Sequence, residues 1–162
     1  MQRGPTLAAA WALGAVAVDQ AAKWAIARWI PPGESIDLVG RLVRLTHVTN
    51  PGAAFGLFEG RYELFVFATA SVLVLAGVLA TRFERPRSQW ALAGIGLAAG
   101  GAAGNLIDRL RNGAVLDFID VGVWPVFNLA DTAIVSGVAL LFWHLLRQAP
   151  QAVTSPSDGR SR

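Results

Sequence analysis

The chain has 162 residues, of which 54% are hydrophobic and 15% are charged, and its formal net charge is +3. A mean hydropathy of +0.46 excludes a disordered chain and an ordinary soluble domain. The sequence has no cysteine, which excludes disulfides, iron–sulfur clusters, thiolate zinc sites and cysteine nucleophiles. Its basic residues form no stripe interleaved with aromatic residues, so we expect no nucleic-acid partner.

Four apolar segments are each about long enough to cross a bilayer as a helix, which takes roughly 20 residues. They lie at about 7–27, 62–80, 90–107 and 125–146. The first contains Asp19 and Lys23 and the fourth contains Asp131, so these spans carry buried polar groups. We therefore predict an all-α integral membrane protein with four transmembrane helices. A cleavable signal peptide is the alternative for the first segment, because Arg3 precedes an apolar run.

The distribution of arginine predicts the orientation of these spans. The short turn between the second and third segments contains three arginines, Arg82, Arg85 and Arg87. Loops rich in arginine and lysine lie on the cytoplasmic side of a membrane. With four spans, both termini then lie in the cytoplasm. Residues 1–147 are expected to form the membrane domain, and the polar residues 148–162 a disordered cytoplasmic tail.

The longer external loop, residues 28–61, is expected to carry structure of its own. Prolines and a glycine at 31–33 break the first helix. Residues 41–49 are rich in β-branched and aliphatic side chains and partly alternate, which predicts a strand in a small extracytoplasmic β-sheet. Phe55 and Phe58 are three residues apart, which predicts a short surface helix between spans one and two.

Polar residues from every part of the chain gather at one end of the predicted bundle. Asp19 lies about 18 Å along the first span, and Asp131 lies about 9 Å below the external end of the fourth. Charged groups inside a bilayer are costly and usually mark function. A mutually neutralising Asp19–Lys23 pair is the alternative for these two residues. The convergent group is Asp19, Lys23, Asn50, Asn105, Asp108, Arg109, Asp117, Asp120, Asn128 and Asp131.

The third segment has small residues at a helical spacing. Gly96, Gly100 and Gly104 recur every four residues with alanines between them. Small residues let transmembrane helices approach closely, so we interpret this run as a packing face.

A pair of carboxylates sharing one proton is the hydrolytic device that this sequence can build. The two histidines are expected at opposite ends of the bundle, so they cannot share a metal or complete a serine triad. Two adjacent carboxylates cannot both ionise, so one activates water while the other polarises a carbonyl. Asp131 is the most desolvated candidate, and its partner could be Asp108, Asp117 or Asp120. Arg109 next to Asp108 favours a structural role there, which leaves Asp117 and Asp120 open.

Five segments resemble, in order and spacing, the bacterial lipoprotein signal peptidase (signal peptidase II) family. They are DQAAK at 19–23, NPGAAF at 50–55, GGAAGNLIDR at 100–109, VLDF at 115–118 and FNLAD at 127–131. The resemblance covers nearly the whole chain except the tail. It departs at Gly56, where many relatives carry serine, and this affects a local hydrogen bond.

The resemblance implies an intramembrane aspartic endopeptidase that removes the signal peptide from diacylglyceryl-modified prolipoproteins and cleaves before the lipidated cysteine. By its motifs, Asp117 and Asp131 are the catalytic residues, and they activate a water held between them. It implies these substrate-binding or supporting residues: Asp19, Lys23, Asn50, Gly52, Asn105, Asp108, Arg109 and Asn128. No metal and no organic cofactor are implied.

The resemblance also implies the surroundings of the enzyme. Its partners would be a lipid-modified prolipoprotein substrate and membrane lipids. Separately from the resemblance, we expect a monomer. It would lie in the bacterial cytoplasmic (inner) membrane with its active site near the extracytoplasmic face. A small proton-coupled membrane transporter or channel is the alternative function, since intramembrane carboxylates can relay protons. Against that alternative, the carboxylates gather at one end and the spans show no inverted repeat.

Overall fold

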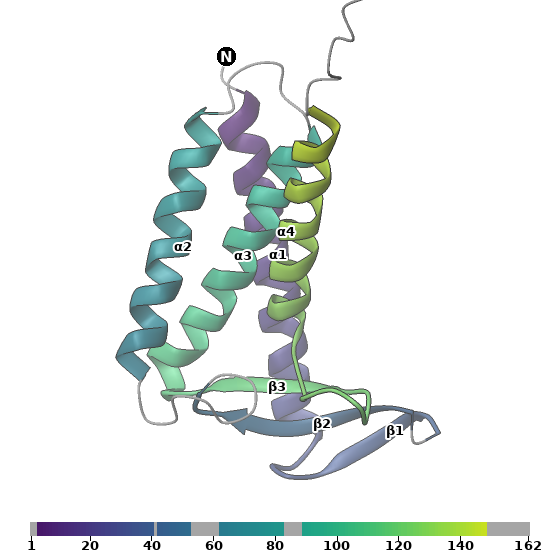
Figure 1. Ribbon diagram of the computed structural model, residues 1–162. Coiled ribbons are helices and arrows are strands. Elements are labelled where there is room, and N and C mark those ends of the chain that lie inside the picture. Colours follow the sequence, from purple (N-terminus) through teal and green to yellow (C-terminus); the bar gives the residue numbers. More distant parts are fainter. Residues whose placement is uncertain (1–2, 41, 53–61, 83–88, 149–162) are drawn as a thin grey trace, which may run out of the picture.

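In the computed structural model, four long helices stand side by side and a small sheet lies across one end of them (Figure 1). The structure describes residues 3–40, 42–52, 62–82 and 89–148. The helices are α1 (Arg3–Trp29), α2 (Tyr62–Arg82), α3 (Gln89–Asn112) and α4 (Leu129–Gln148). The strands are β1 (Ser35–Val39), β2 (Val43–Asn50) and β3 (Val115–Asp120), in the antiparallel order β1-β2-β3.

Helix α3 is the central helix because its small residues admit close neighbours. A Cβ at Gly100 would lie 2.4 Å from the carbonyl oxygen of Ala12 in α1. A Cβ at Gly101 would lie 2.3 Å from the carbonyl oxygen of Ala130 in α4. The predicted glycine face therefore packs on α1, and a second glycine face, which we had not predicted, packs on α4.

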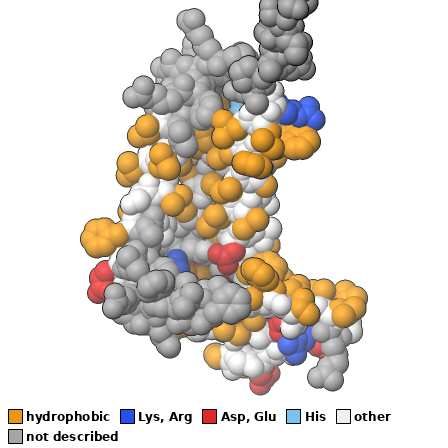
Figure 2. Space-filling view, viewed as in Figure 1, with side chains coloured by type: hydrophobic (Ala, Val, Ile, Leu, Met, Phe, Trp, Pro, Cys, Tyr) orange, Lys and Arg blue, Asp and Glu red, His pale blue; other side chains and the backbone are white. Residues whose placement is uncertain are grey.

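Two of the described helices are long and apolar enough to cross a membrane, namely α3 and the Leu129–Arg147 part of α4. Helix α3 is mostly buried by its neighbours, whereas α4 leaves large apolar side chains such as Val135 and Phe142 exposed. On the face shown in Figure 2, apolar side chains cover the helices and acidic side chains lie toward the sheet end. The mostly helical class and the small sheet agree with the sequence-based prediction.

Two helix ends differ from the expected ones. Helix α4 begins at Leu129 and not at about 125, because Phe127 is held in the sheet by hydrogen bonds with Ile119 in both directions. Asp131 therefore lies in the first turn of α4, and not six residues inside the helix, as the estimate of about 9 Å assumed. Helix α3 continues to Asn112, beyond the expected end at 107.

The predicted strand at 41–49 corresponds to β2, which pairs with two further strands that the sequence did not indicate. Asp117 and Asp120 lie in one of these strands, β3, and not in an open loop. The predicted surface helix around Phe55 and Phe58, the Gly56 departure and nearly all of the predicted tail lie outside the described residues.

Candidate active site

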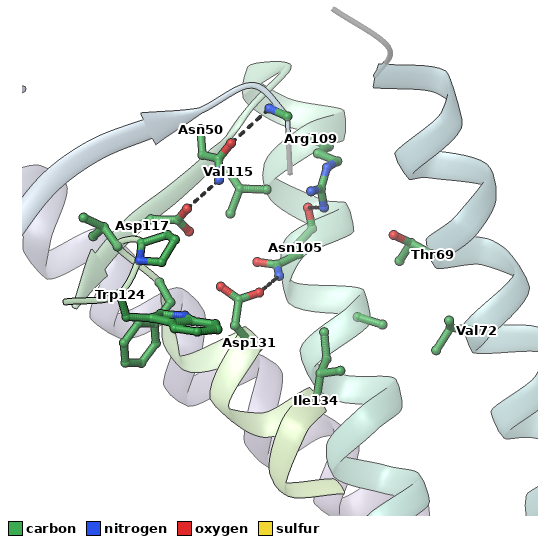
Figure 3. Close-up of a pocket in the computed structure, with 15 residues that line it drawn as sticks. Asn50, Thr69, Val72, Asn105, Arg109, Val115, Asp117, Trp124, Asp131 and Ile134 are labelled. Atoms are coloured by element: carbon green, nitrogen blue, oxygen red, sulfur yellow. Dashed lines mark hydrogen bonds between the residues drawn. The ribbon is translucent and has the colours of Figure 1, made fainter. Parts of the chain in front are cut away.

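A cavity of about 400 Å³ is lined by residues of α2, α3 and α4, of strands β2 and β3, and of the segment between β3 and α4 (Figure 3). Its polar lining residues are Asn50, Asn105, Arg109, Asp117 and Asp131, together with Thr69 of α2 and Gly52. Its apolar lining residues are Val72, Ala102, Val115, Trp124, Pro125, Val126, Phe127 and Ile134. The polar side chains come from the sheet and from the ends of α3 and α4, so the fold brings together segments far apart in the sequence.

Asp117 projects into this cavity from β3 and is 3% exposed. Its Oδ2 accepts a hydrogen bond from Nδ2 of Asn50 at 2.8 Å, and its Oδ1 accepts one from Nδ2 of Asn128 at 2.7 Å. Burial raises the pKa of Asp117 to about 6, the nearby carboxylate of Asp131 adds to this rise, and the two amide hydrogen bonds oppose it. A carboxyl group that titrates close to neutral pH is suited to proton transfer.

Asp131 is fixed by the local structure of the helix that carries it. Asn128 is the N-cap of α4, and its Oδ1 accepts a hydrogen bond from the backbone N–H of Asp131 at 2.9 Å. In return, the backbone N–H of Asn128 donates to Oδ2 of Asp131 at 3.2 Å. This reciprocal arrangement is a capping box. Nδ2 of Asn105 donates to the other carboxylate oxygen, Oδ1, at 2.8 Å (Figure 3). Both oxygens of Asp131 therefore have donors.

The Asp19–Lys23 pair belongs to a larger buried network. Nζ of Lys23 lies 2.9 Å from Oδ2 of Asp19 and 2.7 Å from Oδ2 of Asp108. It also donates to Oδ1 of Asn105 at 3.0 Å. Because Asn105 contacts Asp131, the network reaches the cavity, and the alternative of a self-contained Asp19–Lys23 pair does not describe this structure.

Asp108 links α3 to the strand that follows it. Its Oδ2 accepts a hydrogen bond from the backbone N–H of Leu116 at 3.3 Å, and its Oδ1 accepts one from Nε2 of Gln20 at 2.8 Å. Asp108 does not line the cavity. The sequence analysis missed Gln20, although it stands beside Asp19 in the first motif and its long amide can reach the neighbouring helix.

Asp120 is the last residue of β3, whereas Asn50 of β2 pairs with the first residue of that strand. It forms an ion pair with Arg44 of β2 and accepts a hydrogen bond from the backbone N–H of Gly122 at 2.8 Å. That hydrogen bond and the Arg44 cation hold the pKa of Asp120 below its usual value. Of the two aspartates that the sequence left open, Asp117 lines the cavity and Asp120 does not.

The two remaining predicted residues, Arg109 and Gly52, also line the cavity. A guanidinium N–H of Arg109 donates to the carbonyl oxygen of Asn105 at 3.4 Å. The backbone N–H of Gly52 donates to Oδ1 of Asn50 at 3.0 Å, which turns the chain after β2 and orients the Asn50 amide toward Asp117. In the part of the chain that the structure describes, no group of three or more potential ligands could hold a metal ion.

Comparison with known proteins identifies the family. Residues 11–147 match the family model described as signal peptidase (SPase) II. The chain is 52% identical to the lipoprotein signal peptidase of Pelotomaculum thermopropionicum, over 83% of this chain and 88% of that protein. It is 46% identical to the lipoprotein signal peptidase of Moorella thermoacetica, over 90% of this chain and 96% of that protein.

Solved structures agree with this result. One structure of a bacterial membrane enzyme is similar with a TM-score of 0.78 and 29% identity, covering 96% of this chain and 93% of the other. A second bacterial membrane enzyme is similar with a TM-score of 0.77 and 30% identity, covering 87% and 93%. The resemblance seen in the motifs is confirmed: the chain belongs to the signal peptidase II family and is a lipoprotein-processing peptidase of the aspartic type that is characteristic of this family.

Proposed function

We propose that this protein hydrolyses the peptide bond before the diacylglyceryl-modified cysteine of prolipoproteins, with Asp117 and Asp131 as its catalytic pair. The observation that carries the proposal is the shared cavity. Two carboxylates from different elements line it, and each of their four oxygens accepts a hydrogen bond from the protein. Carboxylates held in this way are preorganised, so little reorganisation is needed during the reaction.

The proposed reaction needs one proton shared between the two carboxylates. The ionised carboxylate takes a proton from a water held between them, and the water oxygen bonds to the scissile carbonyl carbon. The protonated carboxyl group hydrogen-bonds to the carbonyl oxygen. The tetrahedral intermediate then breaks its carbon–nitrogen bond, and a proton moves to the leaving amine. We assign this shared proton to the pair and not to one of the two residues.

The supporting residues have separate roles in this proposal. Asn50, Asn105 and Asn128 donate to the two carboxylates and keep them turned toward the cavity. Arg109 lines the cavity and offers guanidinium N–H groups to the carbonyl oxygens of the bound peptide. The chain itself thus supplies donors for both the catalytic pair and the substrate backbone.

We also propose that all four helices span the membrane, with both termini in the cytoplasm and the sheet on the extracytoplasmic face. The apolar composition of α3 and α4 supports two of these spans. The start of α1 and the end of α4 lie at the end of the bundle opposite the sheet (Figure 1). With the arginine-rich segment 82–87 in the cytoplasm, the cavity faces the side to which lipoproteins are exported.

The signal peptide is proposed to reach the cavity sideways from the membrane, between α2 and α4. The cavity is bounded there by Val72 of α2, Ala102 of α3 and Ile134 of α4, which are apolar. Helix α2 stands apart from α4 in Figure 1 and packs on α3. An apolar signal-peptide helix can therefore pack along α3 without leaving the hydrocarbon region.

The direct test is incubation of the purified full-length protein with a diacylglyceryl-modified prolipoprotein, followed by mass spectrometry of the products. We expect a mature protein whose first residue is the lipidated cysteine. Cleavage at another bond, or no cleavage by folded protein, would overturn the proposal. A transporter would instead leave the precursor intact and move protons across proteoliposomes.

A further inference from the structure

We infer that Lys23 is a positioning residue of the catalytic pair: it holds the Asn105 amide so that its N–H, and not its oxygen, faces Asp131. This inference rests on the proposed roles of Asp117 and Asp131. Lys23 does not line the cavity, so it is a positioning residue that acts through its neighbours, and of these Asn105 is the one that donates directly to Asp131.

The three protons of the Lys23 ammonium match three oxygen atoms. A lysine ammonium has three donors and no acceptor. Nζ of Lys23 lies 2.9 Å from Oδ2 of Asp19, 2.7 Å from Oδ2 of Asp108 and 3.0 Å from Oδ1 of Asn105. The Lys23 side chain is 5% exposed, so its ammonium is buried with these three partners. Two carboxylates thus fix the cation, and its third proton is directed at the amide.

The Asn105 amide has one orientation that satisfies its neighbours. Its Oδ1 accepts from Lys23 and also from Nδ2 of Asn128 at 3.1 Å, while its Nδ2 donates to Asp131. Turning the amide by half a rotation would bring N–H groups against the ammonium and an oxygen against the Asp131 carboxylate. Hydrogen bonds with a charged partner are about twice as strong as neutral ones, so the Lys23 ammonium fixes the oxygen side of the amide and thereby turns its N–H toward Asp131.

Asn128 connects the Asn105 amide to the second aspartate, Asp117. Its Oδ1 accepts from the backbone N–H of Asp131, which fixes its own amide. Its Nδ2 is then directed to Oδ1 of Asn105 and to Oδ1 of Asp117. If Asn105 moves, Asn128 loses one of its acceptors, and both carboxylates lose the geometry needed to hold the water.

The test separates positioning from charge neutralisation. Lys23→Arg keeps a cation beside Asp19 and Asp108, but its planar guanidinium cannot reproduce the three directions of an ammonium. We expect Lys23→Arg to lower kcat by roughly tenfold or more, with KM within about twofold of wild type, because an interaction needed only in the reaction is lost. In an Asn105→Ala background the same substitution should have no further effect on kcat.

Arg44→Lys is the matched control, since it also exchanges the cation of an ion pair but lies away from the cavity. It should change thermal stability without changing kcat. If Lys23→Arg does not fold, as judged by thermal unfolding in detergent, Lys23→Gln is assayed in the same two backgrounds with the same expectations.

Two outcomes would overturn the inference: wild-type kcat in the folded Lys23 variant, or an equal loss of kcat with and without the Asn105 amide. The proposed function fails separately, if Asp117→Asn or Asp131→Asn turns over the precursor. If the aspartate variants are inactive and Lys23→Arg is fully active, the proposed function stands and the positioning role of Lys23 is rejected.

Discussion

Asp19 in α1 accepts a hydrogen bond from the backbone N–H of Ala130 in α4 at 2.9 Å. Ala130 directly precedes Asp131, and its N–H is one of the groups that a helix leaves without an internal partner at its start. A carboxylate at this position also interacts favourably with the helix dipole. The first helix therefore holds the end of α4 that presents Asp131 to the cavity.

Gly104→Ala should disturb this contact. A Cβ at position 104 would lie 2.8 Å from Oδ2 of Asp19, so the carboxylate must move away from Ala130. We expect a loss of about 1–3 kcal/mol in the free energy of unfolding and slower cleavage. Gly14→Ala is the control, because nothing lies within 4 Å of a Cβ there. Equal unfolding temperatures and cleavage rates for the two variants would contradict the capping role of Asp19.

Asp117→Asn should gain stability relative to wild type as the pH rises. The pKa of Asp117 is about 6 in the folded protein and 3.8 for an ordinary aspartate. The folded state therefore binds more protons between these values, and wild type loses stability as the pH rises through this window. Asparagine at position 117 does not ionise, so whatever stability the substitution costs through altered hydrogen bonds does not vary with pH. The size of the effect is on the order of 3 kcal/mol.

The measurement is the difference in Tm between Asp117→Asn and wild type from about pH 4 to pH 7. It should rise across the range and level off above the pKa of Asp117. Asp37→Asn makes the same change at an exposed position of β1. A Tm difference for Asp117→Asn that is independent of pH would show that this carboxyl group is not perturbed by burial.

The proposed orientation predicts which cysteines an impermeant thiol reagent can label. Glu34→Cys, exposed before β1, should be labelled in cells stripped of any outer membrane. Gln89→Cys, exposed at the opposite end of the bundle at the start of α3, should be labelled only after the membrane is opened. The chain has no native cysteine, so the background is low. The reverse pattern would place the cavity in the cytoplasm and contradict the proposed substrate.

Lipid modification should act by holding the scissile bond at the level of the cavity. Asp131 lies in the first turn of α4, at the sheet end of the bundle. Each buried methylene contributes about 0.8 kcal/mol to membrane anchoring, so the diacylglyceryl group keeps the cysteine at this boundary. We expect the kcat/KM of the unlipidated precursor to be lower by at least a factor of about ten, which corresponds to a difference of about 1.4 kcal/mol or more. Equal rates for the two precursors in detergent would show that recognition depends on the peptide alone.

The sequence predicted the helices and the convergence of polar residues because apolar length and motif spacing are local properties. It could not choose between Asp117 and Asp120 on physical grounds. That choice depends on strand register: Asp120 pairs with Arg44 across the sheet, whereas Asp117 pairs with Val48 after an irregularity in β2. Register depends on the partner strand, so it is not readable from β3 alone.

The start of α4 was missed for a related reason. Residues 125–127 are apolar and read as the start of the span, but Phe127 is paired with Ile119 of the sheet. The FNLAD motif nevertheless contained the signal, because Asn128 and Asp131 have the spacing of a capping box. Gln20 was missed because its partner Asp108 is 88 residues away in the chain.

The most direct test of the central claim is the single-turnover rate of cleavage of the diacylglyceryl-modified precursor by Asp117→Asn, Asp131→Asn and the double variant, each folded in detergent. Asparagine is nearly isosteric with aspartate but cannot exchange the proton. We expect each single variant to lose cleavage as completely as the double variant, because the two residues act as a unit. Asp120→Asn, which removes a carboxylate outside the cavity, should retain most of the activity. Substantial cleavage by folded Asp117→Asn or Asp131→Asn, or a loss at Asp120→Asn equal to theirs, would contradict the assignment of the catalytic pair.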